Sequence, residues 1–228
     1  EAVLLDVPRE WHLIPLCELE SLPRSPHSPG LHHRRAARSM RPVPMDTTAA
    51  LRAIGICAVV GTHMGVIQAQ GGAHLMLAVA GYNFARFQLA ATGRWGPFRS
   101  GLRTAARVGL PASLWIGANL AVTGRYSVGA ALLVNDYTGV ASRTDGRWEY
   151  WYFEAFVKIV VAASLLVSVP ALRRWEQRRP YGFALTVVVA LLLLRYDVIE
   201  LGGHHNYLFR AHTVAWFFAL GWLVFRSR

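Results

Sequence analysis

The chain has 228 residues, a net charge of +11 and a hydrophobic fraction of 54%. Charged residues make up 16%, below the ~25% of soluble domains, which argues against an ordinary soluble protein. Because the arginines fall in clusters between apolar segments, the positive charge indicates membrane-flanking loops and argues against nucleic acid as a partner.

Residues 1–45 are the first of two predicted regions. The stretch 21–30 is rich in proline and turn residues and cannot form a long helix. His32, His33 and several arginines follow, which predicts a basic segment on the cytoplasmic face of a membrane. The chain begins without a methionine or a signal peptide, so we expect it to be a piece of a longer product.

Residues 46–228 are the second region, a membrane domain. Its apolar segments approach the ~20 residues that cross a bilayer. We expect six transmembrane helices, at about 47–67, 73–91, 102–122, 150–172, 181–196 and 207–225. The apolar stretch 128–134 is too short to span and predicts an interfacial or re-entrant segment. The predicted fold class is all-α, a polytopic membrane helix bundle.

Arginine placement predicts the orientation of these helices. Arginines flank alternate loops, whereas the short loops 68–72 and 200–206 contain no Lys or Arg. By the positive-inside rule, both termini are cytoplasmic. The expected location is a bacterial inner, or plasma, membrane, with the chain crossing it several times.

An ionisable pair on the first predicted helix is the leading functional signal. Arg52 and His63 lie eleven positions apart, about three helical turns, so both side chains share one face. An ionisable residue within a membrane is costly unless it is paired, which makes each a functional-site hypothesis. The alternatives are a histidine that packs between helices and an arginine that reaches the lipid headgroups.

This Arg-x10-His spacing resembles the signature of acyltransferase family 3, multi-pass membrane O-acyltransferases that modify sugars, lipids and natural products. The resemblance covers about residues 46–228. It implies acyl-CoA as the donor substrate, a hydroxyl-bearing acceptor, membrane lipids as surroundings, and no bound cofactor or metal. It also implies that His63 is the catalytic base and that Arg52 holds the acyl-CoA phosphates. The family has more membrane helices than six, which implies that this domain is incomplete.

Two further stretches are similar to family motifs. Arg103 and Arg107, followed by Pro111, resemble an arginine pair that would hold the phosphates with Arg52. Their alternative is a positive-inside cluster. Tyr82, which follows Gly81, resembles an aromatic motif and is implied to contact the substrate. Pro111 also predicts a kink in the third helix.

The fourth predicted helix opens with Trp151, in a stretch that resembles a family Trp-aromatic-x-Glu motif. Glu154 and Lys158 are four residues apart and can pair within the membrane. We expect Glu154 to face the interior near the first helix, where it would orient His63 or a sugar hydroxyl, and Lys158 to contact the substrate. The alternative is a self-contained structural ion pair.

The remaining signals are weaker. The sequence near Leu22 and Arg34 is similar to the tail of an acyl-adenylate-forming ligase, but without the catalytic lysine. His204 and His205 have no carboxylate spaced to complete a metal site. The expected function is therefore a membrane O-acyltransferase that moves an acyl group from cytoplasmic acyl-CoA to a hydroxyl. The alternative is a non-catalytic truncated bundle or a transporter-like module.

Overall fold

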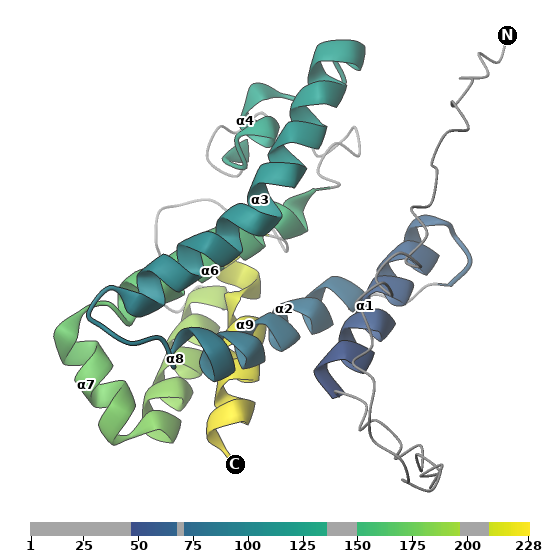
Figure 1. Ribbon diagram of the computed structural model, residues 1–228. Helices are drawn as coiled ribbons and strands as arrows, with labels where there is room; N and C mark the ends of the chain where they lie inside the picture. The colour runs from purple at the N-terminus through teal and green to yellow at the C-terminus, as the bar shows by residue number, and fades with distance from the viewer. Residues whose placement is uncertain (1–46, 68–70, 136–149, 197–209) are drawn as a thin grey trace, which may run out of the picture. The chain divides into compact units, whose positions relative to one another are not determined.

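The computed structural model describes residues 47–67, 71–135, 150–196 and 210–228, and within these ranges it contains helices and no strands (Figure 1). The elements are α1 (Thr47–His63), α2 (Gly72–Asn83), the π-helical turn η1 (Phe84–Gln88), α3 (Gly96–Thr123), α4 (Val128–Ala131), α6 (Trp151–Leu166), α7 (Pro170–Arg178), α8 (Pro180–Arg195) and α9 (Ala211–Arg226). The expected all-α class is confirmed.

The chain divides into two units, Glu1–Val43 and Pro44–Arg228. The first unit lies outside the described residues, and so do the ligase-like stretch and the loop that carries His204 and His205. The description below therefore concerns the second unit alone.

α2 and α9 pack in the same direction at close range. His74 contacts Phe217 near one end of the pair, and Tyr82 contacts Phe225 near the other. Glycines permit this approach because a larger residue would collide with the facing backbone. A Cβ added at Gly221 would lie 1.8 Å from the carbonyl oxygen of Ala78, and one added at Gly81 would lie equally close to a carbonyl of α9.

α3 and α6 pack in opposite directions through small residues on α3. Gly101, near the start of α3, lies against Ser164, near the end of α6, and Gly109 lies against Val157. The buried residues of α3 recur every three or four positions and form one stripe: Pro97, Gly101, Ala105, Gly109, Ala112 and Ile116. The helix continues through Pro111, which is exposed.

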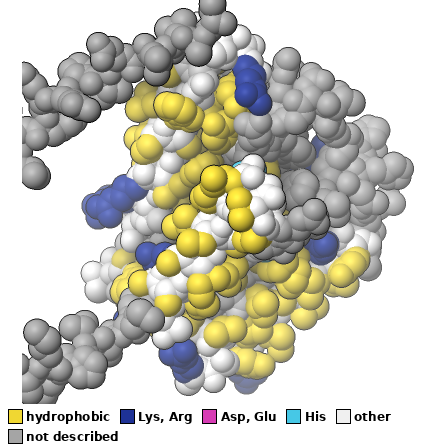
Figure 2. All heavy atoms as spheres, turned by 90° about the vertical axis from the view of Figure 1, so that its right-hand side faces the viewer, with side chains coloured by type: hydrophobic (Ala, Val, Ile, Leu, Met, Phe, Trp, Pro, Cys, Tyr) yellow, Lys and Arg dark blue, Asp and Glu magenta, His cyan; other side chains and the backbone are white. Residues whose placement is uncertain are grey.

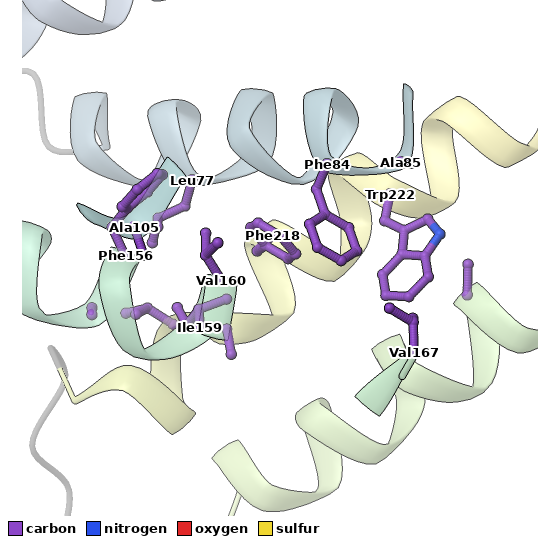
Figure 3. Packing of buried hydrophobic residues seen from close by; sticks show 14 of the residues in the cluster. Leu77, Phe84, Ala85, Ala105, Phe156, Ile159, Val160, Val167, Phe218 and Trp222 are labelled. Carbon is purple, nitrogen blue, oxygen red and sulfur yellow. The ribbon is translucent and has the colours of Figure 1, made fainter. Parts of the chain in front are cut away.

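The largest hydrophobic cluster joins α2, η1, α6, α8 and α9. Its aromatic centre consists of Phe84, Phe218, Trp222 and Phe183, with ring centroids 5.2–5.5 Å apart in the contacting pairs. Figure 3 shows Phe84 pointing from α2–η1 toward Phe218 and Trp222 of α9, with Val160 of α6 nearby. Large aromatic side chains therefore fill the space between helices that are themselves short.

The prediction of one uninterrupted helix over 150–172 is wrong. α6 ends at Leu166, and α7 leaves it at an angle of 88° (Figure 1). Pro170 explains the break, because proline lacks the amide proton of a helix interior and forces the preceding residue into an extended conformation. Val169 has that conformation, with φ −70° and ψ 119°. The buried hydroxyl of Ser168 donates to the carbonyl of Ser164 and satisfies part of the broken helix end.

Among the described residues, no single helix is both long and apolar enough to cross a bilayer, and α6 with α7 meets both requirements only as a bent pair. α8 and α9 begin and end close to the predicted boundaries, and each has 16 residues.

α1 contributes little to the buried core. Its buried residues are Thr48 and Gly55, whereas Ile54, Val60 and Met64 are about half exposed or more. Figure 2, which views the right-hand side of Figure 1, shows hydrophobic side chains spread over the described part of that face, with separate Lys and Arg side chains between them.

Candidate functional site

Arg52 lies on the stripe of α1 that contacts α2. It stands between Thr48 and Gly55, within about 60° of each around the helix. The guanidinium is exposed and makes no hydrogen bond or ion pair with any residue that the structure describes. Its positive charge acts on the hydroxyl of Tyr152, in the first turn of α6.

His63 is the last residue of α1 and lies beyond the contact with α2. Gly55 lies against Gly72, the first residue of α2. Gly72 also lies against Ala58 and Val59, and His63 is four residues, about 6 Å, further along α1. The imidazole is exposed, and no hydrogen bond, ion pair or ring contact joins it to Glu154 or to another described residue. The helix that carries the Arg52–His63 spacing is present, but its last turn, with His63, lies beyond the contact with α2.

The predicted ion pair between Glu154 and Lys158 is present. Lys158 Nζ lies 2.5 Å from Glu154 Oε1, and the two side chains are 16% and 6% exposed. The carboxylate faces the interior, as expected. Burial removes part of the water from both charges, and the attraction between the two charges offsets that desolvation cost.

A cavity of about 620 Å³ lies beside this pair, between α6, α8 and α9. Most of its lining is apolar and comes from residues such as Leu166, Leu191 and Phe218. Lys158, Arg210 and His212 supply cationic or titratable groups to its wall. This combination suits an amphiphilic molecule with an apolar body and a polar or anionic group.

His74 is a candidate that the sequence reasoning missed. Its ring lies 4.6 Å from Phe217 and 5.7 Å from Trp151, centroid to centroid, and the charge of Arg195 acts on it. Trp151 lies about one helical turn from Glu154 on α6. The rule that singled out His63, an ionisable residue within an apolar segment, applies equally to His74 and would have found it.

Arg103 and Arg107 lie on the exposed face of α3. The buried stripe of α3 includes Gly101 and Ala105, and a shift of two residues turns a side chain by about 200° to the opposite face. Arg99 shares this outer face and is exposed as well. The structure therefore keeps the two arginines on one face, as predicted, but that face is the one that α6 does not cover.

Tyr82 lines a second hollow, of about 310 Å³, between α1, α2 and α9. Its ring contacts Phe225 edge to face, and the Arg228 guanidinium lies 5.4 Å from its centroid. Arg86 also lines the hollow, and Thr48 of α1 closes one side. Aliphatic residues complete the lining: Leu51, Leu75, Val79, Leu220 and Val224.

Arginines gather where α2, α6 and α9 end and where α3 and α8 begin. Arg226 of α9 donates to the buried Glu176 of α7, and Arg173 of α7 donates to the backbone carbonyl of Gly93 in the connection between α2 and α3. We call this the arginine-rich end. Its residues are Arg86, Arg94, Arg173, Arg174, Arg178, Arg179, Arg226 and Arg228. His74 and His212 lie toward the opposite ends of α2 and α9, which we call the histidine end.

The described part of the chain contains no group of three or more His, Cys, Asp or Glu side chains that could hold a metal ion. Comparison of the whole sequence and structure with family models, curated proteins and solved structures gives no match.

Proposed function

We propose that this chain is an integral membrane O-acyltransferase that takes its acyl group from acyl-CoA. The observation that carries the proposal is a pair of cavities lined by α9, one at the arginine-rich end and one that reaches the histidine end. The first suits a phosphate-bearing acyl donor and the second an amphiphilic acceptor. A bacterial inner membrane, with both termini cytoplasmic, would place the donor cavity on the side where acyl-CoA is made.

The donor cavity combines the two chemical features of acyl-CoA. Arg86 and Arg228 supply guanidinium groups, which match phosphate oxygens and keep their charge in apolar surroundings. The aliphatic lining suits an acyl chain. Arg52 does not line the cavity itself, but it lies within about one helical turn of the lining residues Thr48 and Leu51 of α1, and on that ground it is retained as a donor contact. Arg103 and Arg107 lie outside this lining, so the proposal gives them no contact with the donor.

The chemical step needs one base. The acceptor oxygen would attack the thioester carbonyl and form a new C–O bond while the C–S bond breaks. The acceptor's proton would pass to an imidazole and then to the departing thiolate. The family resemblance assigns this imidazole to His63. The packing around Trp151 and Glu154 favours His74, which lies about 12 Å along α2 from Tyr82.

A non-catalytic bundle that binds an amphiphile, or a transporter-like module, is the second candidate. The exposed position of His63, beyond the end of the α1–α2 contact, favours it. In that case the cavity beside Lys158 would bind a ligand without transforming it.

The test uses the full chain in nanodiscs, with labelled acetyl-CoA binding measured beside acetyl transfer to a sugar hydroxyl. Loss of the base should reduce turnover by about 10²–10⁴-fold and leave acetyl-CoA binding nearly unchanged. We expect this result for His63→Ala or for His74→Ala, each serving as the control for the other. Binding without transfer in the unmodified chain would support the non-catalytic candidate, and absence of binding would contradict the proposed function.

A further inference from the structure

α7 presents a basic surface whose arginines divide into two groups. Arg173 is used within the fold, because its guanidinium donates to the carbonyls of Ala91, Gly93 and Arg94 at 3.2, 2.5 and 3.3 Å. Arg174 and Arg178 are exposed. Arg174 Nε donates to the carbonyl of Pro170 in its own helix, and among the described residues no carboxylate pairs with either arginine.

The carboxylate that could neutralise this surface is turned away from it. Glu176 is 5% exposed and accepts from Arg226 beneath α7. The contact between Trp175 and Phe183 also holds α7 against α8, with ring centroids 5.1 Å apart. α7 is therefore fixed with its acidic group underneath and its unpaired guanidinium groups outward.

Two hollows open on this surface and share Arg174. One, of about 450 Å³, is lined by Ala171, Arg174, Trp175, Arg178 and Arg179. The other, of about 480 Å³, is lined by Gly93, Arg94, Ser168, Pro170, Arg173, Arg174 and Gln177. Each hollow thus has at least three guanidinium groups, and no acidic side chain lines either of them.

We propose that this surface binds the phosphate of an anionic lipid headgroup, such as that of phosphatidylglycerol. Planar guanidinium groups match phosphate oxygens in two-pronged contacts. Trp175 and Trp95 are 40% and 47% exposed, and tryptophan is the side chain that membrane interfaces favour. The 88° turn from α6 into α7 gives a short amphipathic helix the direction it needs to lie along a membrane surface.

The inference uses the membrane location in the proposed function and does not depend on acyl transfer. The test places the full chain in phosphatidylcholine nanodiscs, without acyl-CoA, that contain spin-labelled phosphatidylglycerol or spin-labelled phosphatidylcholine. The measurement is the fraction of each labelled lipid that associates with the protein, expressed as the ratio of phosphatidylglycerol to phosphatidylcholine. We expect the unmodified chain to prefer phosphatidylglycerol.

Arg174→Gln should reduce that preference by about fivefold, the effect expected for one arginine near an anionic membrane surface. Arg125→Gln is the matched control, because it also removes one exposed guanidinium but lies just past the far end of α3. The control should keep the preference. Arg178→Gln, which affects one hollow only, should give a smaller loss than Arg174→Gln.

Three results would overturn the proposal. They are equal association of the two lipids in the unmodified chain, an equal loss in Arg174→Gln and Arg125→Gln, and loss of the preference on addition of millimolar inorganic phosphate. The last result would identify a site for free phosphate. A chain that fails to bind acetyl-CoA but keeps this lipid preference would contradict the proposed function alone.

Discussion

Glu154 and Lys158 show how far a local spacing predicts a contact. A separation of four residues on one helix brings two side chains together wherever the helix lies, so the pair could be predicted without knowledge of the fold. The surroundings of His74 could not be predicted from such a local spacing. They come from α6, α8 and α9, which lie far along the chain from α2.

Removal of Lys158 alone should destabilise the fold. In Lys158→Met the buried Glu154 carboxylate loses its ion pair with Lys158, and breaking a buried ion pair by removal of one residue typically costs about 3–5 kcal/mol. The free energy of unfolding, measured by detergent titration, should fall by about this amount. The double variant Glu154→Gln, Lys158→Met should lose less stability than the single variant, because it removes both charges of the ion pair.

If the double variant is as unstable as the single one, the pair is not self-contained, and partners beyond the pair stabilise its charges. If the single variant unfolds at the same detergent concentration as the unmodified chain, the ion pair makes no contribution to stability.

For whole helices, sequence patterns predict where a helix begins and ends better than they predict which of its faces is buried. The boundaries of α8 and α9 follow from apolar runs flanked by arginines. The break before Pro170 could have been predicted from that proline, but the direction of α7 depends on contacts of Arg173 and Glu176 that join distant segments. The exposed face of Arg103 is set by α6, which packs on the opposite side of α3.

Gly221→Ala should separate α2 from α9. The new Cβ would lie 1.8 Å from a backbone carbonyl oxygen, which cannot move without shifting α2. Overpacking of this kind typically costs about 1–3 kcal/mol. Gly117→Ala is the control, because no atom lies within 4 Å of its added Cβ and alanine favours the helix by about 1 kcal/mol.

Thermal unfolding in detergent should therefore shift downward for Gly221→Ala and remain the same or rise for Gly117→Ala. Similar melting temperatures for the two variants would mean that α2 and α9 are not in the close contact described here.

At the scale of the whole second unit, contacts between distant segments give the arginine clusters their common position. The positive-inside rule predicted clusters on alternate loops. Within the described residues, the observed directions of α2, α3, α6, α8 and α9 bring Arg94, the α7 arginines and Arg226 to one end. The two cavities could not be predicted from the sequence, because each is lined by helices that are distant in the chain and depends on how α9 packs between them.

In the proposed function, the arginine-rich end takes up acyl-CoA on the cytoplasmic side of a membrane. The direct measurement is binding of labelled acetyl-CoA, which does not cross membranes, to inside-out and right-side-out vesicles that carry the chain. The orientation of the chain would be verified with an impermeant maleimide in two variants, Met64→Cys and Gln177→Cys. Met64 lies just past the end of α1, Gln177 lies near the end of α7, and both are exposed. In both variants Cys17 and Cys57 are replaced by Ala.

We predict binding to inside-out vesicles only, and at least about tenfold weaker binding in Arg228→Gln, since a hydrogen bond to a charged group is worth about 1.5–3 kcal/mol. Equal binding in both vesicle orientations, or binding that Arg228→Gln leaves unchanged, would contradict the account.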